Sequence, residues 1–102
     1  MVVEYVRYEL PDSECAEFRA RYRKAGLKLS ADENCLAWEL TQGVEETGRH
    51  TVRIVWTSRE GHESGFRATD GYQEFLSLLR PFRSYITEMG HHRWLLGERW
   101  AR

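Results

Sequence analysis

The sequence is poor in the features that mark several common classes of protein. Only two of its 102 residues are cysteines, Cys15 and Cys35, and they do not form a CxxC motif. We therefore expect reduced thiols that pack as small apolar side chains, and no disulfide framework. No apolar run approaches the roughly 18 residues that a membrane-spanning helix needs, and no apolar leader opens the chain. These absences predict a cytoplasmic protein with no membrane partner.

An excess of positive charge is also absent. The chain has 15 Lys and Arg residues against 16 Asp and Glu residues, which gives a formal net charge of −1. A nucleic-acid-binding domain usually carries a basic excess, so we expect no nucleic acid partner. The sequence has no P-loop, no dinucleotide glycine fingerprint and no nucleophile elbow. We therefore expect the protein to work without a cofactor.

Large aromatic side chains, in contrast, are abundant. Aromatic residues make up 13% of the chain and include four Trp and five Tyr. The length suits a single domain spanning residues 1–102. A core of this size is too small to enclose so many rings, so some of them are expected to line a pocket or a partner surface.

Four segments have the composition and alternation of β-strands. β-branched and aromatic residues with interleaved polar ones open the chain, and Leu36, Trp38 and Leu40 later share one face of an alternating segment. A turn at Thr47-Gly48 joins that segment to the next, which predicts a hairpin. The predicted strands are Val2–Leu10, Cys35–Val44, Thr51–Trp56 and about Thr87–Leu96.

A first helix is predicted to begin at Pro11-Asp12-Ser13, which ends the strand and supplies the N-cap. Apolar residues then recur every three or four positions, which is one stripe of a helix that reaches about Ser30. Gly26 lies within this stripe and costs the helix about 1 kcal/mol relative to Ala.

A second helical stripe begins near Asp70, which we expect to cap it, and ends before Pro81. Ahead of it, Ser58 is expected to cap a short helical turn. That turn carries His62 and Phe66 four residues apart, so both side chains face the same way.

The predicted order is β-α-β-β-α-β, which is the ferredoxin-like α+β arrangement with an antiparallel sheet. Both helices then cover one face of the sheet. The opposite face carries Val3, Tyr5 and Val55, which are too apolar to face open water. Covering that face with a second copy of the sheet gives a homodimer, the dimeric α+β barrel.

Three short motifs give the chain a family resemblance. They are CLAWEL at residues 35–40, IVWTSREGH at residues 54–62 and the pair Gly65-Phe66. Together they resemble the antibiotic biosynthesis monooxygenase family, and the W-x-S-x-E stretch that starts at Trp56 is the most specific part. The match covers nearly the whole chain to about residue 90, and it is closest to a variant that also occurs joined to truncated globins.

This resemblance implies a dimer of ferredoxin-like protomers, each with a pocket between its sheet and its helices. It also implies insertion of oxygen into phenols, anthrones or quinols without metal or flavin. Trp56 matches the pocket Trp of anthrone-oxidising relatives, whereas His62 and Val52 stand where those relatives have Tyr and Asn.

Haem degradation is not expected from the same resemblance. The relatives that degrade haem use an Asn, a Trp and a haem-ligating His at three places in the fold. By spacing, those places fall at Val6, Gly65 and Phe75 in this sequence.

His62 is the candidate catalytic residue, because an imidazole can accept a phenol proton near neutral pH. The candidate substrate-binding residues are Trp56, Phe66, Tyr72, Phe75 and Trp38. Their rings could stack on a flat substrate. Each also has a plain structural interpretation: His62 as a buried ring bonded to a carbonyl, and the aromatic residues as ordinary core packing.

The His91-His92 pair suggests metal binding, but adjacent strand residues point to opposite faces. No Cys, Asp or Glu lies beside the pair at the spacing of a metal site, so we expect no metal. Two functions stay open. The first is a cofactor-independent monooxygenase acting on a small aromatic quinol, anthrone or phenol. The second is a non-catalytic module of the same fold that binds a small aromatic or redox ligand or docks a redox partner.

Overall fold

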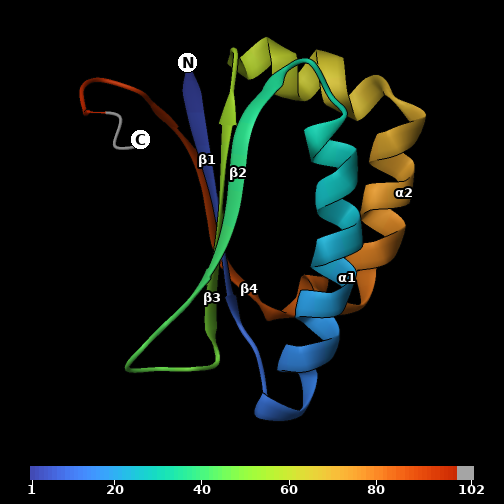
Figure 1. Cartoon of the computed structure of the whole chain (residues 1–102), viewed down its shortest axis with the longest axis vertical. Helices are drawn as coiled ribbons and strands as arrows, with labels where there is room; N and C mark the ends of the chain where they lie inside the picture. Colours follow the sequence, from blue (N-terminus) through green and yellow to red (C-terminus); the bar gives the residue numbers. More distant parts are fainter. Residues whose placement is uncertain (99–102) are drawn as a thin grey trace.

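The computed structural model describes residues 1–98, which form one antiparallel sheet with two long helices packed on one face (Figure 1). The elements follow the predicted order β-α-β-β-α-β. In sequence they are β1 (Val2–Glu9), α1 (Asp12–Ser30), β2 (Cys35–Gln42), β3 (Arg49–Trp56), α2 (Asp70–Leu79) and β4 (Ile86–Arg93).

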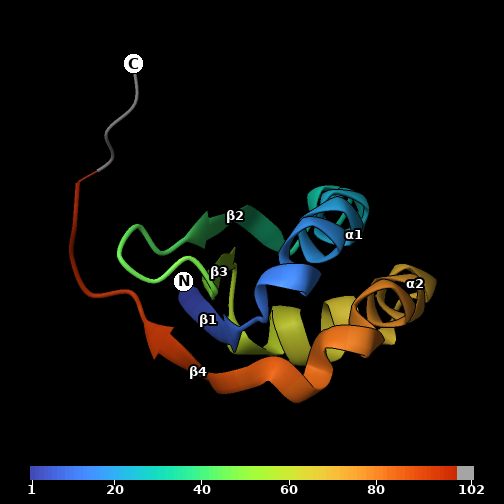
Figure 2. The same ribbon diagram turned by 90° about the horizontal axis from the view of Figure 1, so that it is seen from below.

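The strand order across the sheet is β2-β3-β1-β4, so the two strands that follow α1 and α2 form the edges. β1 lies inside the sheet and pairs in antiparallel fashion with β3 on one side and β4 on the other. Seen from below, α1 and α2 lie side by side on the same side of the sheet (Figure 2). The predicted ferredoxin-like fold with helices on one face is therefore confirmed.

Alternation along β1 decides which side chains enter the core. Val6 and Tyr8 face the helices and belong to the hydrophobic core. Glu4 has the same parity, so its carboxylate also points to the helix side and is 5% exposed. Val3 and Tyr5 lie on the outer face, where Val3 pairs with Val55 across the ladder.

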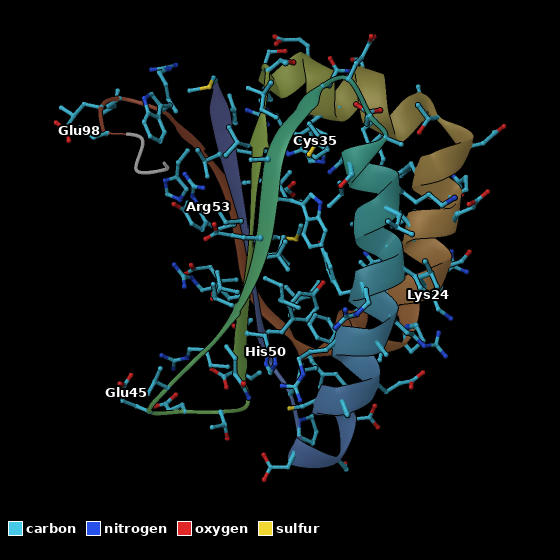
Figure 3. The ribbon with its side chains drawn as sticks, in the orientation of Figure 1. Lys24, Cys35, Glu45, His50, Arg53 and Glu98 are labelled. Carbon is cyan, nitrogen blue, oxygen red and sulfur yellow. The ribbon has the colours of Figure 1, made fainter. Side chains whose placement is uncertain are left out.

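The outer face is less bare than the sequence suggests. Val3 and Val55 are already 4% and 7% exposed within a single chain. On the same face, the Arg7 guanidinium lies 5.7 Å from the centre of the Tyr5 ring. Arg53 projects from the side of the sheet away from the helices (Figure 3).

Near the start of β2 the structure departs from simple alternation. The register against β3 shifts between Cys35 and Ala37, so Leu36 has no partner on β3, and it is 52% exposed. Trp38 and Leu40, in contrast, pack against the core as expected. The prediction that Leu36 shares their face is therefore wrong.

α1 begins at Asp12 with Pro11 as its N-cap, within the predicted Pro11-Asp12-Ser13 segment, but no side chain forms a capping hydrogen bond. The helix buries its apolar stripe and continues through Gly26. A Cβ at Gly26 would overlap the ring of Trp38. The glycine therefore makes room for that ring, whose indole N–H donates to the Ser30 hydroxyl at 2.9 Å.

The cap of α2 is Thr69 rather than Asp70: its hydroxyl accepts a hydrogen bond from the Tyr72 N–H at 3.1 Å. α2 ends at Leu79 and continues as a 3₁₀ helix, η3 (Arg80–Tyr85), which accommodates Pro81. The chain between β3 and α2 forms a π-helical turn, η1 (Gly61–Gly65), and a short 3₁₀ turn, η2 (Phe66–Ala68).

Among residues 1–98, no helix is both long and apolar enough to span a membrane. Both cysteines are free; Cys15 is buried and Cys35 is half-buried. Burial raises the pKa of the Cys35 thiol to about 11. At neutral pH this thiol is therefore protonated and a poor nucleophile.

Candidate functional site

A cavity of about 410 Å³ lies between the sheet and the helices. Its sheet side comes from β1, β3 and β4, and its other walls come from α1, from the turn after β3, from α2 and from η3. This volume falls within the range of pockets that hold small molecules. Apolar and aromatic side chains form most of the lining, together with a carboxylate, an imidazole and three guanidinium groups.

Five of the six predicted site residues line this one cavity. They are Trp56, His62, Phe66, Tyr72 and Phe75. Trp38 is the exception: its ring packs beside Tyr22 and over Gly26, away from the cavity. The structure therefore places five predicted residues together and leaves Trp38 in a packing position.

The aromatic wall is built from ring-to-ring contacts. The rings of Trp56 and His62 are stacked, with centroids 4.6 Å apart and planes 11° apart. Phe66 lies edge-on to Tyr72 at 5.4 Å and to Phe75 at 5.5 Å. These contacts join the rings into one continuous aromatic wall of the cavity.

The turn after β3 holds His62 over Trp56. The Ser58 hydroxyl accepts the Gly61 N–H at 2.9 Å, so Ser58 caps the turn as predicted. The backbone at Gly61 and Gly65 passes so close to the Asn34 side chain that a Cβ at either position would clash with it. Tight packing of this turn fixes the imidazole at 4% exposure.

Glu4 brings a buried carboxylate to the same cavity. Its Oε1 accepts a hydrogen bond from the indole N–H of Trp56 at 3.1 Å. Burial raises the pKa of Glu4, while the Trp56 hydrogen bond and the positive charges of His91 and Arg67 lower it in part. A buried carboxylate with few partners is a group that readily accepts a proton or a cation.

Two histidines surround this carboxylate. His62 Nε2 lies 3.6 Å from Glu4 Oε1, and His91 Nε2 lies 4.0 Å from Glu4 Oε2. The two imidazoles are hydrogen-bonded to each other, with 2.7 Å between His62 Nδ1 and His91 Nε2. His91 is partly accessible, with 21% of its side chain exposed, so the pair connects the buried site with solvent.

The two adjacent histidines of β4 do point in opposite directions. His91 faces Glu4 and His62, whereas His92 lies on the outer face with its ring 5.3 Å from that of Tyr5. The sequence-based argument against a metal assumed that no carboxylate accompanies the pair. That assumption is wrong in three dimensions, because Glu4 and His62 come from other elements.

His62 stays neutral at physiological pH. Burial, followed by the charges of Arg67 and His91, lowers its pKa to about 4. Among the described residues its Nε2 has no hydrogen-bond partner, and this nitrogen carries the lone pair in the tautomer whose Nδ1–H donates to His91 Nε2. The Tyr8 phenol also lines the cavity, but burial raises its pKa to about 12, so it remains protonated.

The same three groups are the described residues that could hold a metal ion. One ligand atom each from Glu4, His62 and His91 lies within 4.8 Å of the others. No other group of three such side chains in residues 1–98 has this geometry.

Three arginines, Arg67, Arg80 and Arg83, stand where the cavity reaches the surface. None of their guanidinium groups forms an ion pair within the part of the chain that the structure describes. Glu4 is the only acidic residue that lines the cavity, and it is buried. The mouth is therefore positive and favours a ligand that carries or develops negative charge.

The sequence analysis missed Glu4, and it considered His91 as a metal ligand but set it aside. Glu4 did leave a signal, because it shares the parity of Val6 and Tyr8 on a strand whose apolar residues build the core. A carboxylate at a core position needs a partner or a function. For His91, the partners lie on other elements, so its own neighbours in the sequence could not identify it.

Comparison with solved structures supports the fold assignment. Many of the similar structures are antibiotic biosynthesis monooxygenases. SnoaB, a cofactor-independent oxygenase from Streptomyces nogalater whose structure is that of a variant, has a TM-score of 0.78 and 18% identity, over 94% of each chain. Rv0793 from Mycobacterium tuberculosis has a TM-score of 0.72 and 15% identity, over 95% of this chain and 96% of that one.

A further structure, described simply as an antibiotic biosynthesis monooxygenase, has a TM-score of 0.76 and 15% identity over 94% of this chain and all of that one. This chain therefore has the ferredoxin-like α+β fold of antibiotic biosynthesis monooxygenases, and at these identities the likeness concerns the fold. The predicted closeness to the variant joined to truncated globins stays a prediction.

At the level of sequence, no family model matches the chain. The uncharacterized protein YczJ of Bacillus subtilis strain 168 is 28% identical over 91 residues, which is 89% of this chain and 96% of that protein.

Proposed function

We propose that the protein is a cofactor-independent monooxygenase that acts on a small aromatic quinol, anthrone or phenol. One observation carries the proposal: the neutral imidazole of His62 stacks on Trp56 beside the Glu4 carboxylate, inside an aromatic cavity of about 410 Å³. A base, a flat apolar wall and limited access to water are what such a reaction requires.

The reaction begins when the substrate transfers its acidic proton to His62 Nε2. Glu4 Oε1, 3.6 Å from that nitrogen, offsets the positive charge that then forms on the imidazole. The resulting anion is a far better electron donor to O₂ than its neutral parent. The balance closes without a co-reactant. In an anthrone, the ring C–H₂ group and O₂ give C=O and H₂O. In a quinol, O₂ converts a ring C–H to C–OH and the quinol to the quinone, with H₂O as the second product, and in a phenol it gives the quinone and H₂O. In each case the substrate supplies all four electrons.

The other cavity residues have binding roles in this proposal. Trp56 and Phe66 present their ring faces and edges to the planar substrate, and Tyr72 and Phe75 close the opposite side. Arg67 at the mouth favours the anion electrostatically.

A non-catalytic module is the second candidate, and Val52 is the observation that favours it. Val52 stands where the anthrone-oxidising relatives carry Asn, and here it is fully buried in the core. The cavity therefore lacks the polar group that the resemblance would supply at this position. A protein of this kind would bind a small aromatic or redox ligand, or dock a redox partner, without turnover.

Oxygen uptake separates the two candidates. Purified protein is mixed with anaerobically prepared 2-methyl-1,4-naphthoquinol or anthrone, and the rate is compared with a blank that contains no protein. A monooxygenase consumes one O₂ per substrate at a rate that scales with protein concentration. Binding of the same compounds with no uptake above the blank would support the non-catalytic module.

A further inference from the structure

We propose that Glu4, His62 and His91 form a reversible binding site for one divalent transition-metal ion, and that the bound ion inhibits turnover. The metal site stands on the geometry of the three side chains alone. The inhibition rests on the proposed function: an ion bound to His62 Nδ1 leaves the single ring proton on Nε2, so Nε2 can no longer accept the proton of the substrate.

Three separate elements bring the ligands together. Glu4 is on β1, His91 is on the neighbouring strand β4, and His62 is on the turn after β3. The side chains of Glu4 and His62 are each 6% exposed, and that of His91 is 21% exposed. A site of this kind is held by the sheet itself, so its ligands need little ordering when an ion binds.

The interatomic distances are close to those of an occupied site. Ligand atoms about 2.1 Å from one ion lie roughly 3.0–3.5 Å from each other. His62 Nδ1 and His91 Nε2, at 2.7 Å, must move apart slightly. His91 Nε2 and Glu4 Oε2, at 4.0 Å, must approach by about half an ångström, a rotamer-scale adjustment.

Supporting hydrogen bonds orient the carboxylate. The Trp56 indole N–H donates to Glu4 Oε1 at 3.1 Å, which leaves Oε2 directed toward His91. A hydrogen-bond donor that orients a metal-binding carboxylate in this way is typical of metal sites in proteins. Burial also leaves the carboxylate with little solvent to compensate its charge, so a cation gains from binding there.

Ligand chemistry selects the ion. Two imidazoles and one carboxylate suit Zn²⁺ and the other late divalent transition metals, whereas Mg²⁺ and Ca²⁺ prefer oxygen ligands. The positive charge of Arg67 repels the metal ion. The Arg67 side chain is exposed and its charge is screened by solvent, so this repulsion weakens metal binding without preventing it.

In the first test, the full chain is treated with a chelator and then titrated with Zn²⁺, and calorimetry measures the binding. We expect one Zn²⁺ per chain, with Mg²⁺ giving no signal. His91→Ala and His62→Ala should each weaken binding at least tenfold. His92→Ala is the matched control, because it removes the adjacent imidazole from the opposite face and should leave the affinity unchanged. Equal affinity in the wild-type chain and in His91→Ala would overturn the site.

The second test measures oxygen uptake at increasing Zn²⁺. Inhibition should follow the calorimetric binding curve, and chelator should restore the rate. If the rate of oxygen uptake stays the same or rises when the protein is saturated with Zn²⁺, the proposed inhibition is wrong. The calorimetric titration still tests the metal site in that case. If the metal-free protein turns over no quinol, anthrone or phenol, the proposed function fails and the inhibition fails with it. The titration then stands as the test of the metal site by itself.

Discussion

The candidate site is formed by side chains that are far apart in the sequence and close together in the fold. His62 and the rings that follow it could be predicted, because residues four apart on a turn share a face and a strand-ending Trp lies beside them. Glu4 and His91 could not be found in the same way. They meet because β1 and β4 are neighbours in the sheet, with Glu4 directly opposite His91 in the register.

Removing the charge of Glu4 tests its role as the partner of His62. In Glu4→Gln the amide oxygen can still accept the Trp56 indole N–H, so we expect a fold of nearly normal stability. The amide cannot offset the charge on a protonated imidazole. We predict that kcat falls on the order of 10²-fold, the lower end of the loss for a missing general base, with KM little changed.

Steady-state oxygen uptake measures this effect, and thermal unfolding checks the fold. Glu9→Gln is the control, since Glu9 lies on the same strand but pairs with Arg49 at the surface. A normal kcat in Glu4→Gln, or an equal loss in Glu9→Gln, would argue against a role for the carboxylate in proton transfer.

At the scale of elements, the sequence predicted the order and type of every strand and long helix, because each has a clear period. It was wrong about two local details, and it could not explain a third feature. The bulge at the start of β2 exposes Leu36, and the first available hydroxyl, on Thr69, replaces Asp70 as the cap of α2. Gly26 is the third case: it costs helix propensity, and only the structure explains it through Trp38.

Gly26→Ala is therefore predicted to destabilise the protein, although Ala has a higher helix propensity than Gly. An Ala at an open helical position stabilises by about 1 kcal/mol, but a Cβ here would overlap a ring held by the Ser30 hydroxyl. We expect a net loss of about 1–3 kcal/mol, typical of overpacking. Urea unfolding measures it.

Gly71→Ala is the matched control for this substitution. Its Cβ would meet nothing closer than the Thr69 hydroxyl at 3.6 Å, so the added methyl fits within α2. We expect a gain of up to about 1 kcal/mol. A stabilising Gly26→Ala would show that Trp38 moves aside freely and that the glycine has no packing role.

For the whole molecule, the sheet has one face covered by helices and one that lacks a covering layer (Figure 2). After β4 the chain turns toward this outer side, where Leu95 and Leu96 are 82% and 88% exposed. Two exposed leucines beside an uncovered sheet face favour a partner surface. We propose that a second copy of the chain covers this face.

A homodimer would have a mass of about 24 kDa, twice the 12.1 kDa of the chain. It should bury roughly 1,600 Å² or more in total, the size of a standard stable interface. Sedimentation velocity at micromolar concentration measures the mass directly. A single 12.1 kDa species throughout that range would contradict the proposal.

The most direct test of the central claim is the rate of oxygen uptake by His62→Ala compared with the wild-type chain on the same quinol or anthrone. Loss of the proton acceptor should reduce the rate by about 10²–10⁴-fold. His62→Gln should be equally slow, since its amide hydrogen-bonds but does not accept the proton. Uptake by His62→Ala at the wild-type rate would contradict the assignment of His62 as the base.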